Sequence, residues 1–418
     1  MSLNFEKIAE CFDTPTYVYD VDSIRAGRNE LFAILPEGTK VYYALKANPH
    51  PDIVMAIREG APGPCGAEIS SVGELNTALE AGFPAEDILY TGPGKTSNEI
   101  ICALESNVRH FSVESISDFR RIEEAAAMGN WQPQCLLRIN KGGDGMDASV
   151  QMLGRPSQFG IDAETLPDLA EELRGARFAK IVGLHCYAGS NVENESALLE
   201  GFRRAMILAR QLRDEFRLRM EVVDLGGGFA SPYARVGRRT SYPTLRSRLE
   251  DILETELPGW RDITIAVESG RYVVGESGHL MTRVTNVKES RGKIFSIVDA
   301  GINILGGLSG LNRLLPMSAQ FAQCEKTGQV NVVGPLCTPG DLLSREGDAS
   351  TASEGQLLVI PNVGAYGATA SLLAFLGRPA PLELLMEGST VISCSRLQVT
   401  RASCPIPAGV FGSDEALT

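Results

Sequence analysis

The chain has 418 residues, of which 44% are hydrophobic and 22% are charged, a composition typical of a folded globular protein and not of a disordered or fibrous one. Its 52 acidic and 39 basic residues give a net charge of −13, which opposes binding to nucleic acid and to anionic membrane surfaces. Nine cysteines form no C-x-x-C pair, which favours free thiols in a reducing compartment and argues against structural zinc. Because no apolar signal segment and no run of 18 apolar residues occurs, we expect a cytoplasmic protein without a membrane span.

The first predicted elements are a strand over residues 14–22 and a helix over residues 23–35. From residue 36 to 280 the chain then alternates short apolar runs with longer amphipathic segments, the pattern of repeated βα units. Eight apolar runs occupy residues 40–45, 66–70, 87–92, 109–113, 135–140, 180–185, 221–226 and 263–268. Eight strands within about 250 residues predict a (β/α)₈ barrel of the TIM type. A doubly wound open sheet is the alternative, because the pattern of one sequence does not show closure.

After residue 280 the helical periodicity is lost, and strands divided by Gly, Pro and Ser turns are predicted. The strand-like segments cover residues 279–290, 293–301, 330–336, 355–364 and 389–397, and residues 345–355 form a polar loop. We therefore expect a second, mostly β domain with a Greek-key barrel-like arrangement, built from residues 281–418. The strand near residue 14 could complete this domain, so residues 1–35 are assigned to it.

In a barrel, functional groups gather at the C-terminal ends of the strands. Lys46 follows the first strand, where a desolvated amine could form a Schiff base, although a lysine whose amine reaches solvent is the simpler reading. His185 ends the sixth strand, and a satisfied core histidine is its simpler reading.

The ends of the last two strands add an anion site and two charges. Gly226, Gly227 and Gly228 could wrap backbone N–H groups around a phosphate, or form a tight structural turn. Glu268 and Arg271 follow the eighth strand and could equally form a surface ion pair. An amine, an anion cradle and a carboxylate at one mouth are the groups that pyridoxal phosphate requires for its aldehyde, phosphate and ring nitrogen.

Several stretches in sequence order resemble the fold type III pyridoxal-phosphate decarboxylases, the family of diaminopimelate and ornithine decarboxylases. The resemblance covers nearly the whole chain, from TPTYVYD to SCSRL. The matching stretches are YYALKANPH, GAEISSVGEL, FSVES, SQFGID, GLHCYAGSN, VVDLGGGF, VESGRYVVGESG, IVDAG, VVGPLCTPGD and NVGAYGA. The resemblance implies a barrel that carries the cofactor, a C-terminal β domain, and a head-to-tail homodimer whose active sites borrow residues across the interface.

The resemblance also implies residue roles. Lys46 would bind pyridoxal phosphate covalently, Glu268 would pair with the pyridine nitrogen, and Cys337 would reach in from the partner subunit, so these three are the predicted catalytic residues. The remaining predicted cofactor contacts are Glu68, His185, Tyr187, Ser190, Gly226, Gly227, Gly228, Arg271 and Tyr366. The predicted substrate contacts are Thr338, Asp341, Asn303 and Gly307, and no metal is expected.

The sequence departs from the diaminopimelate decarboxylase pattern at three places. Tyr187 stands where those enzymes have the histidine of H-I-G-S, and residues 337–341 read C-T-P-G-D in place of C-E-S-G-D. Residues 301–310 carry no charge in place of an arginine-bearing segment. Such a pocket suits a substrate whose distal end carries no free charge, and the variant motifs resemble a branch that acts on amino acids attached to acyl-carrier proteins in specialised metabolism.

Three alternatives remain open from the sequence. The chain could decarboxylate a free amino acid such as diaminopimelate or ornithine. It could be an amino-acid racemase, although racemases of this fold pair the pyridine nitrogen with arginine and this chain has Glu268. It could be a non-catalytic pyridoxal-phosphate-binding protein, although such barrels lack a second domain. If the substrate is carrier-bound, Arg235, Arg238 and Arg239 are the predicted basic docking patch, with a solvated basic loop as the simpler reading.

Overall fold

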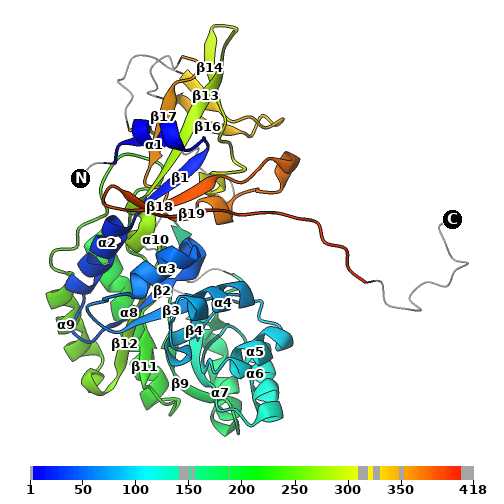
Figure 1. Cartoon of the computed structure of the whole chain (residues 1–418). Coiled ribbons are helices and arrows are strands. Elements are labelled where there is room, and N and C mark those ends of the chain that lie inside the picture. The colour runs from blue at the N-terminus through cyan, green and yellow to red at the C-terminus, as the bar shows by residue number, and fades with distance from the viewer. Residues whose placement is uncertain are drawn as a thin grey trace, which may run out of the picture.

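The computed structural model describes residues 3–140, 150–151, 156–187, 189–308, 319–322, 330–347 and 353–405 (Figure 1). Ala188, residues 309–310 of the uncharged stretch, and residues 348–352 of the predicted polar loop lie outside this part of the chain. The molecule has two lobes, a barrel surrounded by helices and a second lobe of long strands above it (Figure 1). Among the described residues, no helix has the length and apolar character needed to cross a bilayer.

The lower lobe is a closed parallel barrel. Its strands are β2 (Lys40–Ala44), β3 (Cys65–Ile69), β4 (Ile88–Tyr90), β5 (His110–Val113), β6 (Gln134–Asn140), β9 (Lys180–His185), β11 (Val222–Asp224) and β12 (Thr264–Ser269). Neighbouring strands pair in parallel, and the sheet closes because β5 also pairs with β6 while β12 pairs with β2. All eight predicted strands are present in the predicted order, which confirms the TIM-type fold and excludes the doubly wound sheet.

Helices cover the outside of the barrel. They are α3 (Pro51–Arg58), α4 (Val72–Glu80), α5 (Ser97–Glu105), α6 (Ile116–Gly129), α7 (Leu166–Gly175), α8 (Glu195–Asp214), α9 (Leu245–Glu256) and the short α10 (Arg271–Val274). Polar residues cap several helices at their N-termini, as Ser71 does for α4 and Thr96 does for α5 in a capping box with Glu99. Inside the barrel, Tyr42, Leu89, Leu136, Val182 and Ala266 pack together, so the barrel is filled and its functional surface is the mouth.

Short elements complete the barrel loops. Strand β8 (Ile161–Asp162) pairs with β6, and β10 (Gly189–Ser190) pairs with β7 (Val150–Gln151). The short 3₁₀ helices are η1 (Leu45–Ala47), η2 (Ala85–Asp87), η3 (Ala163–Thr165), η4 (Trp260–Asp262), η5 (Gly275–Ser277), η6 (Gly306–Leu308), η7 (Ala368–Ala370) and η8 (Phe375–Gly377).

The upper lobe is an eight-stranded sheet with the order β16-β15-β14-β13-β1-β18-β19, in which β17 pairs with β13. Its strands are β1 (Thr16–Asp20), β13 (Gly278–Ser290), β14 (Lys293–Val298), β15 (Val330–Val333), β16 (Leu342–Gly347), β17 (Leu357–Pro361), β18 (Leu382–Glu387) and β19 (Thr390–Arg396). Strands β16 and β18 were not among the predicted strands. The sequence of β18, LELLME, consists of good helix formers, so its strand conformation comes from pairing with β1 and β19.

The opening segment connects the two lobes. Strand β1 pairs antiparallel with β13 and parallel with β18, so the predicted strand near residue 14 does join the C-terminal sheet. Helix α1 (Phe5–Cys11) precedes it, and helix α2 (Val21–Ala33) follows it. On α2, Arg28 donates hydrogen bonds to the carbonyl oxygens of Ala56 and Ile57 at the end of α3, so this helix packs on the barrel.

The mouth of the barrel faces the upper lobe. The backbone N–H of Tyr366 donates to Ala47 O at 2.7 Å, and the Asn48 side chain donates to Gly364 O at 2.9 Å. These bonds join the loop that follows β2 to the segment that follows β17. Residues from the C-terminal part of the chain therefore lie directly over the strand ends of the barrel.

Candidate active site

A pocket opens at the mouth of the barrel and brings together most of the predicted cofactor contacts. Its lining includes residues from the ends of β2, β9, β11 and β12 and one residue from the upper lobe. The predicted residues in this lining are Lys46, Tyr187, Ser190, Gly227, Gly228, Glu268, Arg271 and Tyr366. Residues far apart in the sequence therefore form a single site, as the barrel prediction requires.

Lys46 is held at the pocket by carboxylates. Its Nζ lies 3.0 Å from both carboxylate oxygens of Glu68, which ends β3. Glu68 also accepts a hydrogen bond of 2.5 Å from Thr91 Oγ1. Desolvation lowers the pKa of the Lys46 amine, but the carboxylates of Glu68 and Glu268 outweigh it and raise the pKa above its usual range. The lysine thus lies between two acidic groups that fix its position.

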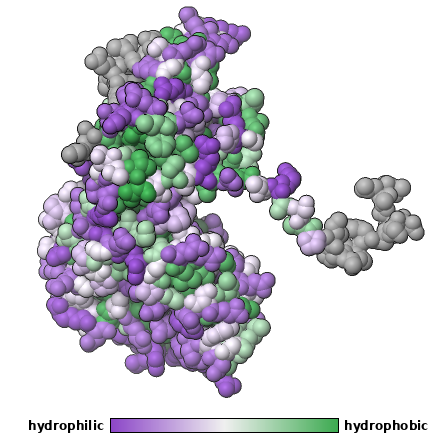
Figure 2. All heavy atoms as spheres, in the orientation of Figure 1, coloured by the Kyte–Doolittle hydropathy of each residue, from purple (hydrophilic) through white to green (hydrophobic). Residues whose placement is uncertain are grey.

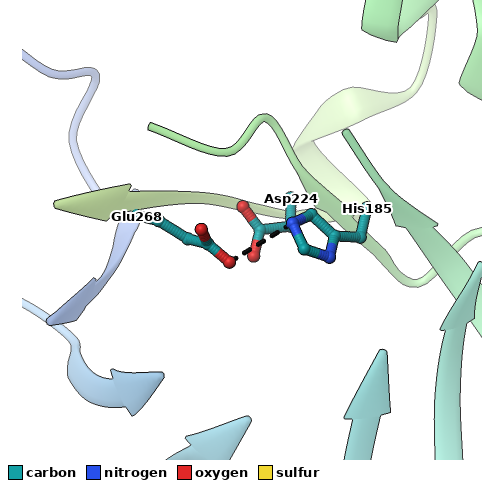
Figure 3. A group of neighbouring side chains, drawn as sticks. All are labelled: His185, Asp224 and Glu268. Atoms are coloured by element: carbon teal, nitrogen blue, oxygen red, sulfur yellow. Dashed lines mark ion pairs between the residues drawn. The ribbon is translucent and has the colours of Figure 1, made fainter. Parts of the chain in front are cut away.

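Three buried ionisable side chains meet beneath the pocket, as Figure 3 shows. His185 from β9, Asp224 from β11 and Glu268 from β12 place their ligand atoms within 4.8 Å of one another. His185 Nε2 lies 3.3 Å from Glu268 Oε1, and His185 Nδ1 lies 2.8 Å from Ser112 Oγ. The side chain of His185 is 1% exposed and that of Glu268 is 4% exposed, so water screens these interactions little.

Burial shifts the pKa of each member of this cluster. Desolvation, followed by the charges of Glu68 and Asp224, raises the pKa of Glu268 well above its usual range. Desolvation raises the pKa of Asp224 to about 7. Desolvation, followed by the positive charge of Arg138, lowers the pKa of His185 well below its usual range. His185 is therefore neutral near pH 7, and the carboxyl groups need a nearby cationic or proton-sharing group to stay ionised.

The same cluster has the residue types of a metal site, and no metal is expected from the sequence. Lys46 and Arg138 both place positive charge close to His185. Both groups would repel a metal cation bound among these side chains. A protonated ring nitrogen that shares its proton with Glu268 adds less positive charge than a metal ion does. The electrostatics therefore favour a pyridinium group over a metal ion.

The glycine turn after β11 lies beside Glu268. Gly226 and Gly228 adopt positive φ angles of 72° and 122°, which favour glycine. At Gly227 a Cβ atom would lie 3.0 Å from Glu268 O and 3.4 Å from the Tyr187 ring. The turn is thus packed tightly against the walls of the pocket, and a side chain at Gly227 would crowd the cradle.

Arg271 and Tyr366 close the other end of the pocket. The Arg271 guanidinium lies 5.0 Å from the centre of the Tyr366 ring and 5.7 Å from that of Tyr233. Tyr233 donates a hydrogen bond to Tyr366 O, and a Cβ atom on Gly307 would lie 2.4 Å from the Tyr233 hydroxyl. Tyr366 has a φ of 54°, a conformation that non-glycine residues rarely adopt except where the fold imposes it.

These features fit pyridoxal phosphate. Glu268 Oε1 is buried and has no hydrogen-bond partner among the described residues, so it can accept a hydrogen bond from a protonated ring nitrogen. The glycine turn and Arg271 offer N–H donors for a phosphate, and Lys46 offers an amine for the aldehyde. The three ends of the cofactor thus each find a group of suitable chemistry in one pocket.

The structure does not bring Cys337 and Thr338 into this pocket of a single chain. Cys337 is exposed and Thr338 is partly exposed in the turn between β15 and β16. Asn303 is buried, and its Oδ1 has no hydrogen-bond partner among the described residues. Any contribution of Cys337 and Thr338 to a site formed with a second chain stays a prediction.

Asp341, a predicted substrate contact, has backbone partners in the single chain. Its side chain accepts hydrogen bonds from the backbone N–H of Ile302 at 2.8 Å and of Leu336 at 2.7 Å. Asp341 is 3% exposed, and each carboxylate oxygen accepts one of these bonds. Asp341 thus ties the turn after β14 to the turn that carries Cys337, and its contact with a substrate stays a prediction.

The predicted docking patch also needs correction. The Arg239 side chain is 6% exposed and pairs with Glu276 at 2.9 Å and with Glu30 at 3.3 Å. Arg235 is half-exposed and lies 3.3 Å from Glu193. Arg238 is exposed, 3.9 Å from Glu276. Because Arg239 is buried in ion pairs, these three residues do not form an open basic patch.

Sequence reasoning missed a network behind the site. Arg138 on β6 donates to Glu114 at 2.8 Å, and its guanidinium lies 5.8 Å from the centre of the Tyr187 ring and 4.8 Å from that of Phe159. Glu114 also accepts from the backbone N–H of Gly160 at 3.0 Å. One signal could have revealed this network: Arg138 is a charged residue within the apolar run CLLRIN of a barrel strand.

Comparison with known proteins identifies the family. A family model described as "Pyridoxal-dependent decarboxylase, pyridoxal binding domain" matches residues 21–275. The chain belongs to the pyridoxal-dependent decarboxylases. It is 31% identical over 393 residues to the L-glutamyl-[BtrI acyl-carrier protein] decarboxylase of Niallia circulans, covering 91% of this chain and 90% of that protein. It is also 30% identical to the diaminopimelate decarboxylase of Aquifex aeolicus, covering 93% of this chain and 90% of the relative.

A solved structure gives the same result. The crystal structure of diaminopimelate decarboxylase from Helicobacter pylori complexed with L-lysine matches with a TM-score of 0.81 and 27% identity, covering 94% of this chain and 95% of that one. The chain is therefore a pyridoxal-phosphate-dependent amino-acid decarboxylase, and the predicted family, enzyme class and cofactor are confirmed.

Proposed function

We propose that this decarboxylase acts on an acidic amino acid of the glutamyl or methylaspartyl type, joined through its side-chain carboxyl to the phosphopantetheine thiol of an acyl-carrier protein. The observation that carries the proposal is the absence of charge from residues 301–308, the described part of the stretch that follows β14. Gly307 of this stretch packs against Tyr233 beside the pocket. A thioester abolishes the distal charge of the acid, so such a substrate needs no basic partner there.

The relative from Niallia circulans supports this choice, because its name describes a glutamyl group carried by an acyl-carrier protein. We further propose a role in specialised metabolism, such as antibiotic biosynthesis, where carrier-bound amino acids are processed. Diaminopimelate decarboxylases are similar to the chain to nearly the same degree. A free amino acid is therefore the competing substrate.

The chain's own residues divide the chemistry as follows. When bound, pyridoxal phosphate supplies an electron sink for the charge left on Cα by loss of carbon dioxide. Lys46 would hold the aldehyde end of the cofactor. Glu268 would hold a proton at the ring nitrogen, and Tyr187 would contact the ring. The phosphate would be bound by Ser190, the turn from Gly226 to Gly228, Arg271 and Tyr366.

Buried groups around Glu268 keep it suited to this task. Neutral His185 lies 3.3 Å from Glu268, and Ser112 holds the far nitrogen of the imidazole at 2.8 Å. Without a cationic partner the buried Glu268 carboxylate is disfavoured, as its raised pKa indicates. A protonated ring nitrogen supplies that partner, so Glu268 and the ring stabilise each other in the charged form.

The remaining proton transfer requires a second subunit in this proposal. Cα is protonated by Lys46 or by Cys337 of the partner subunit in a homodimer. Cys337 is exposed, and it lies far in the sequence from the barrel residues that line the pocket. We therefore place the turn between β15 and β16 at the interface between the two subunits in this proposal.

Measurement of carbon dioxide release tests the substrate. Free diaminopimelate, ornithine, lysine, glutamate and methylaspartate are compared with glutamyl and methylaspartyl thioesters of an acyl-carrier protein. We expect turnover of at least one carrier-bound acid and little turnover of the free acids. Efficient release from a free amino acid, with the carrier-bound forms inert, would reject the proposal.

Covalent labelling tests the cofactor assignment. Borohydride reduction followed by peptide mapping is expected to find the cofactor on Lys46. The matched control is Lys40→Ala, because Lys40 begins the same strand and pairs with Asp87 at 2.6 Å, away from the mouth. Labelling is expected in the control and absent in Lys46→Ala. Labelling at another lysine of the wild-type protein would contradict the assignment.

A further inference from the structure

We infer that a groove formed by the end of β19, the segment before β18 and the loops after β2 and β3 is the docking surface for an acidic carrier protein. The inference rests on the proposed carrier-bound substrate. It places the docking surface at Arg378, Arg396 and Arg401, far in the sequence from the basic loop that the sequence analysis indicated.

The outer part of the groove is basic and apolar. A hollow is lined by Leu373, Arg378, Arg396, Leu397, Val399 and Arg401. Among the residues that line it there is no acidic side chain. Leu397 is 39% exposed and Val399 is 63% exposed, so apolar surface is available between the arginines. Figure 1 shows that the chain after β19 runs away from the body of the molecule, and Figure 2 shows hydrophilic and hydrophobic residues next to one another on this segment.

The arginines of this hollow are available to a partner. Within the described residues, none of Arg378, Arg396 and Arg401 belongs to an ion pair, whereas Arg239 is buried between two glutamates. Arg378 donates one hydrogen bond of 3.3 Å to Pro335 O. The chain has a net charge of −13, so these three exposed arginines form a local positive surface on an otherwise acidic protein. Such a surface attracts an acidic partner.

The groove continues inward to the loops of the active site. A second hollow shares Arg396 and Leu397 with the first, and its lining also includes polar Asn48, His50 and Ser71 and acidic Asp52, Glu74 and Glu383. Asn48 lies two residues after Lys46, and Ser71 lies three residues after Glu68. A flexible pantetheine arm that enters at the arginines would therefore be led toward the strand ends that carry the catalytic amine and its carboxylate partner.

The mixed lining of the inner hollow suits such an arm. Beyond its phosphate, the phosphopantetheine arm carries a hydroxyl group, two amides and short aliphatic segments, so it needs both polar contacts and apolar surface. His50 Nε2 lies 2.9 Å from Ser395 Oγ, which joins the loop after β2 to strand β19 and fixes one wall of the hollow. The outer arginines and the inner polar hollow thus match the acidic body and the neutral arm of one loaded carrier.

The test compares two substrates on two charge-reversed variants. The substrates are a glutamyl thioester of an acyl-carrier protein and the glutamyl thioester of free pantetheine. The docking variant is Arg378→Glu/Arg401→Glu, because both residues line only the outer hollow. The control is Arg174→Glu/Arg219→Glu, which makes the same change of charge at exposed positions on the barrel.

We expect the docking variant to raise KM for the carrier-bound acid by about tenfold or more at low salt, with a smaller effect at high salt. Its kcat/KM for the pantetheine thioester should match that of the wild-type and control proteins. Fluorescence anisotropy with a labelled carrier protein should show the same loss of binding without turnover.

Other results separate the possible failures. An unchanged KM for the carrier-bound acid would overturn the docking inference alone. An equal loss with the pantetheine thioester would also overturn it, because the arginines would then serve the catalytic site. Conversion of the docking variant to monomers in light scattering would assign the groove to a second copy of the chain. If the wild-type protein accepts only free amino acids, the proposed function itself fails.

Discussion

The barrel mouth and the turn between β15 and β16 are placed differently for the proposed catalysis. At the mouth, Lys46 follows β2, and its amine, on a side chain that is 45% exposed, lies against buried Glu68 at the end of the neighbouring strand β3. Glu68 and Glu268, on β3 and β12 at either side of β2, are both buried. In the β15–β16 turn, Cys337 is exposed and is not among the residues that line the pocket of its own chain. The proposed cofactor contacts therefore lie within one subunit, whereas the proposed contribution of Cys337 depends on a second one.

The electrostatics of the two regions differ in the same way. Buried carboxylates and cations at the mouth shift one another's pKa values, and such a site selects for a charged cofactor. Residues 301–307 consist of three glycines, three aliphatic residues and Asn303, and they carry no charge. This contrast suggests that the fold keeps the cofactor chemistry fixed while the loops of the upper lobe decide the substrate.

The largest expected effect comes from the barrel. Glu268→Gln keeps the shape of the side chain but removes its negative charge, so the ring nitrogen loses its proton-holding partner. We expect kcat to fall by about 10²- to 10³-fold. The absorbance of the bound cofactor should shift as well, which separates a changed ring from an unfolded protein. The control Glu221→Gln changes an exposed residue before β11 and should leave both unchanged.

An effect of intermediate size tests the division between subunits. In a mixture of Lys46→Ala and Cys337→Ala chains, a mixed dimer has one site with both groups intact. If mixed dimers form at random, about a quarter of the wild-type activity should return. Each variant alone is measured as the baseline. A mixture that contains mixed dimers by native mass spectrometry but shows no gain in activity would place the whole site in one chain.

The barrel and its mouth could be predicted because their signals are local. Each strand is a short apolar run, and Lys46, His185, Glu268 and Arg271 stand at or just past the ends of such runs. Local logic does not reach the partners of Asp341, whose motif position suggests a substrate contact. Its two backbone hydrogen bonds depend on how the turns after β14 and β15 approach each other, which no local pattern encodes.

The upper lobe was predicted less completely for a related reason. Strand β18 has a helix-favouring sequence and becomes a strand only between β1 and β19, which lie about 370 residues apart in the chain. Arg239 looked like part of a basic loop, but Glu30 from α2 lies 3.3 Å from it. Long-range partners decide both cases, and composition alone does not reveal them.

A smaller effect is expected in the pH dependence of stability of the cofactor-free protein. Burial raises the pKa of Asp224 to about 7, above its value in the unfolded chain. Its contribution to stability is therefore fully present below about pH 4 and is lost as the pH rises toward 7. Asp224→Asn removes this titration, so stability should fall less than in the wild-type protein over that range, by a difference on the order of a few kcal/mol.

Urea unfolding of both proteins at several pH values measures this difference. His185, whose pKa is lowered, contributes stability above its unfolded pKa of about 6.5 in both proteins, so it cancels in the comparison. Parallel pH profiles for Asp224→Asn and the wild-type protein would show that Asp224 does not titrate in this range.

The smallest predicted effect concerns Asp341 and the turn that carries Cys337. Asp341→Ala leaves the N–H groups of Ile302 and Leu336 without their acceptors, which should lower the free energy of unfolding by about 1–3 kcal/mol. Asp341→Asn keeps one acceptor and should lose less. Thr338→Val, which removes only an exposed bond from Gly340 at 3.3 Å, is the control and should change stability little. If Asp341→Ala instead keeps the wild-type melting temperature and raises only KM, Asp341 contacts substrate and the structural role assigned to it is wrong.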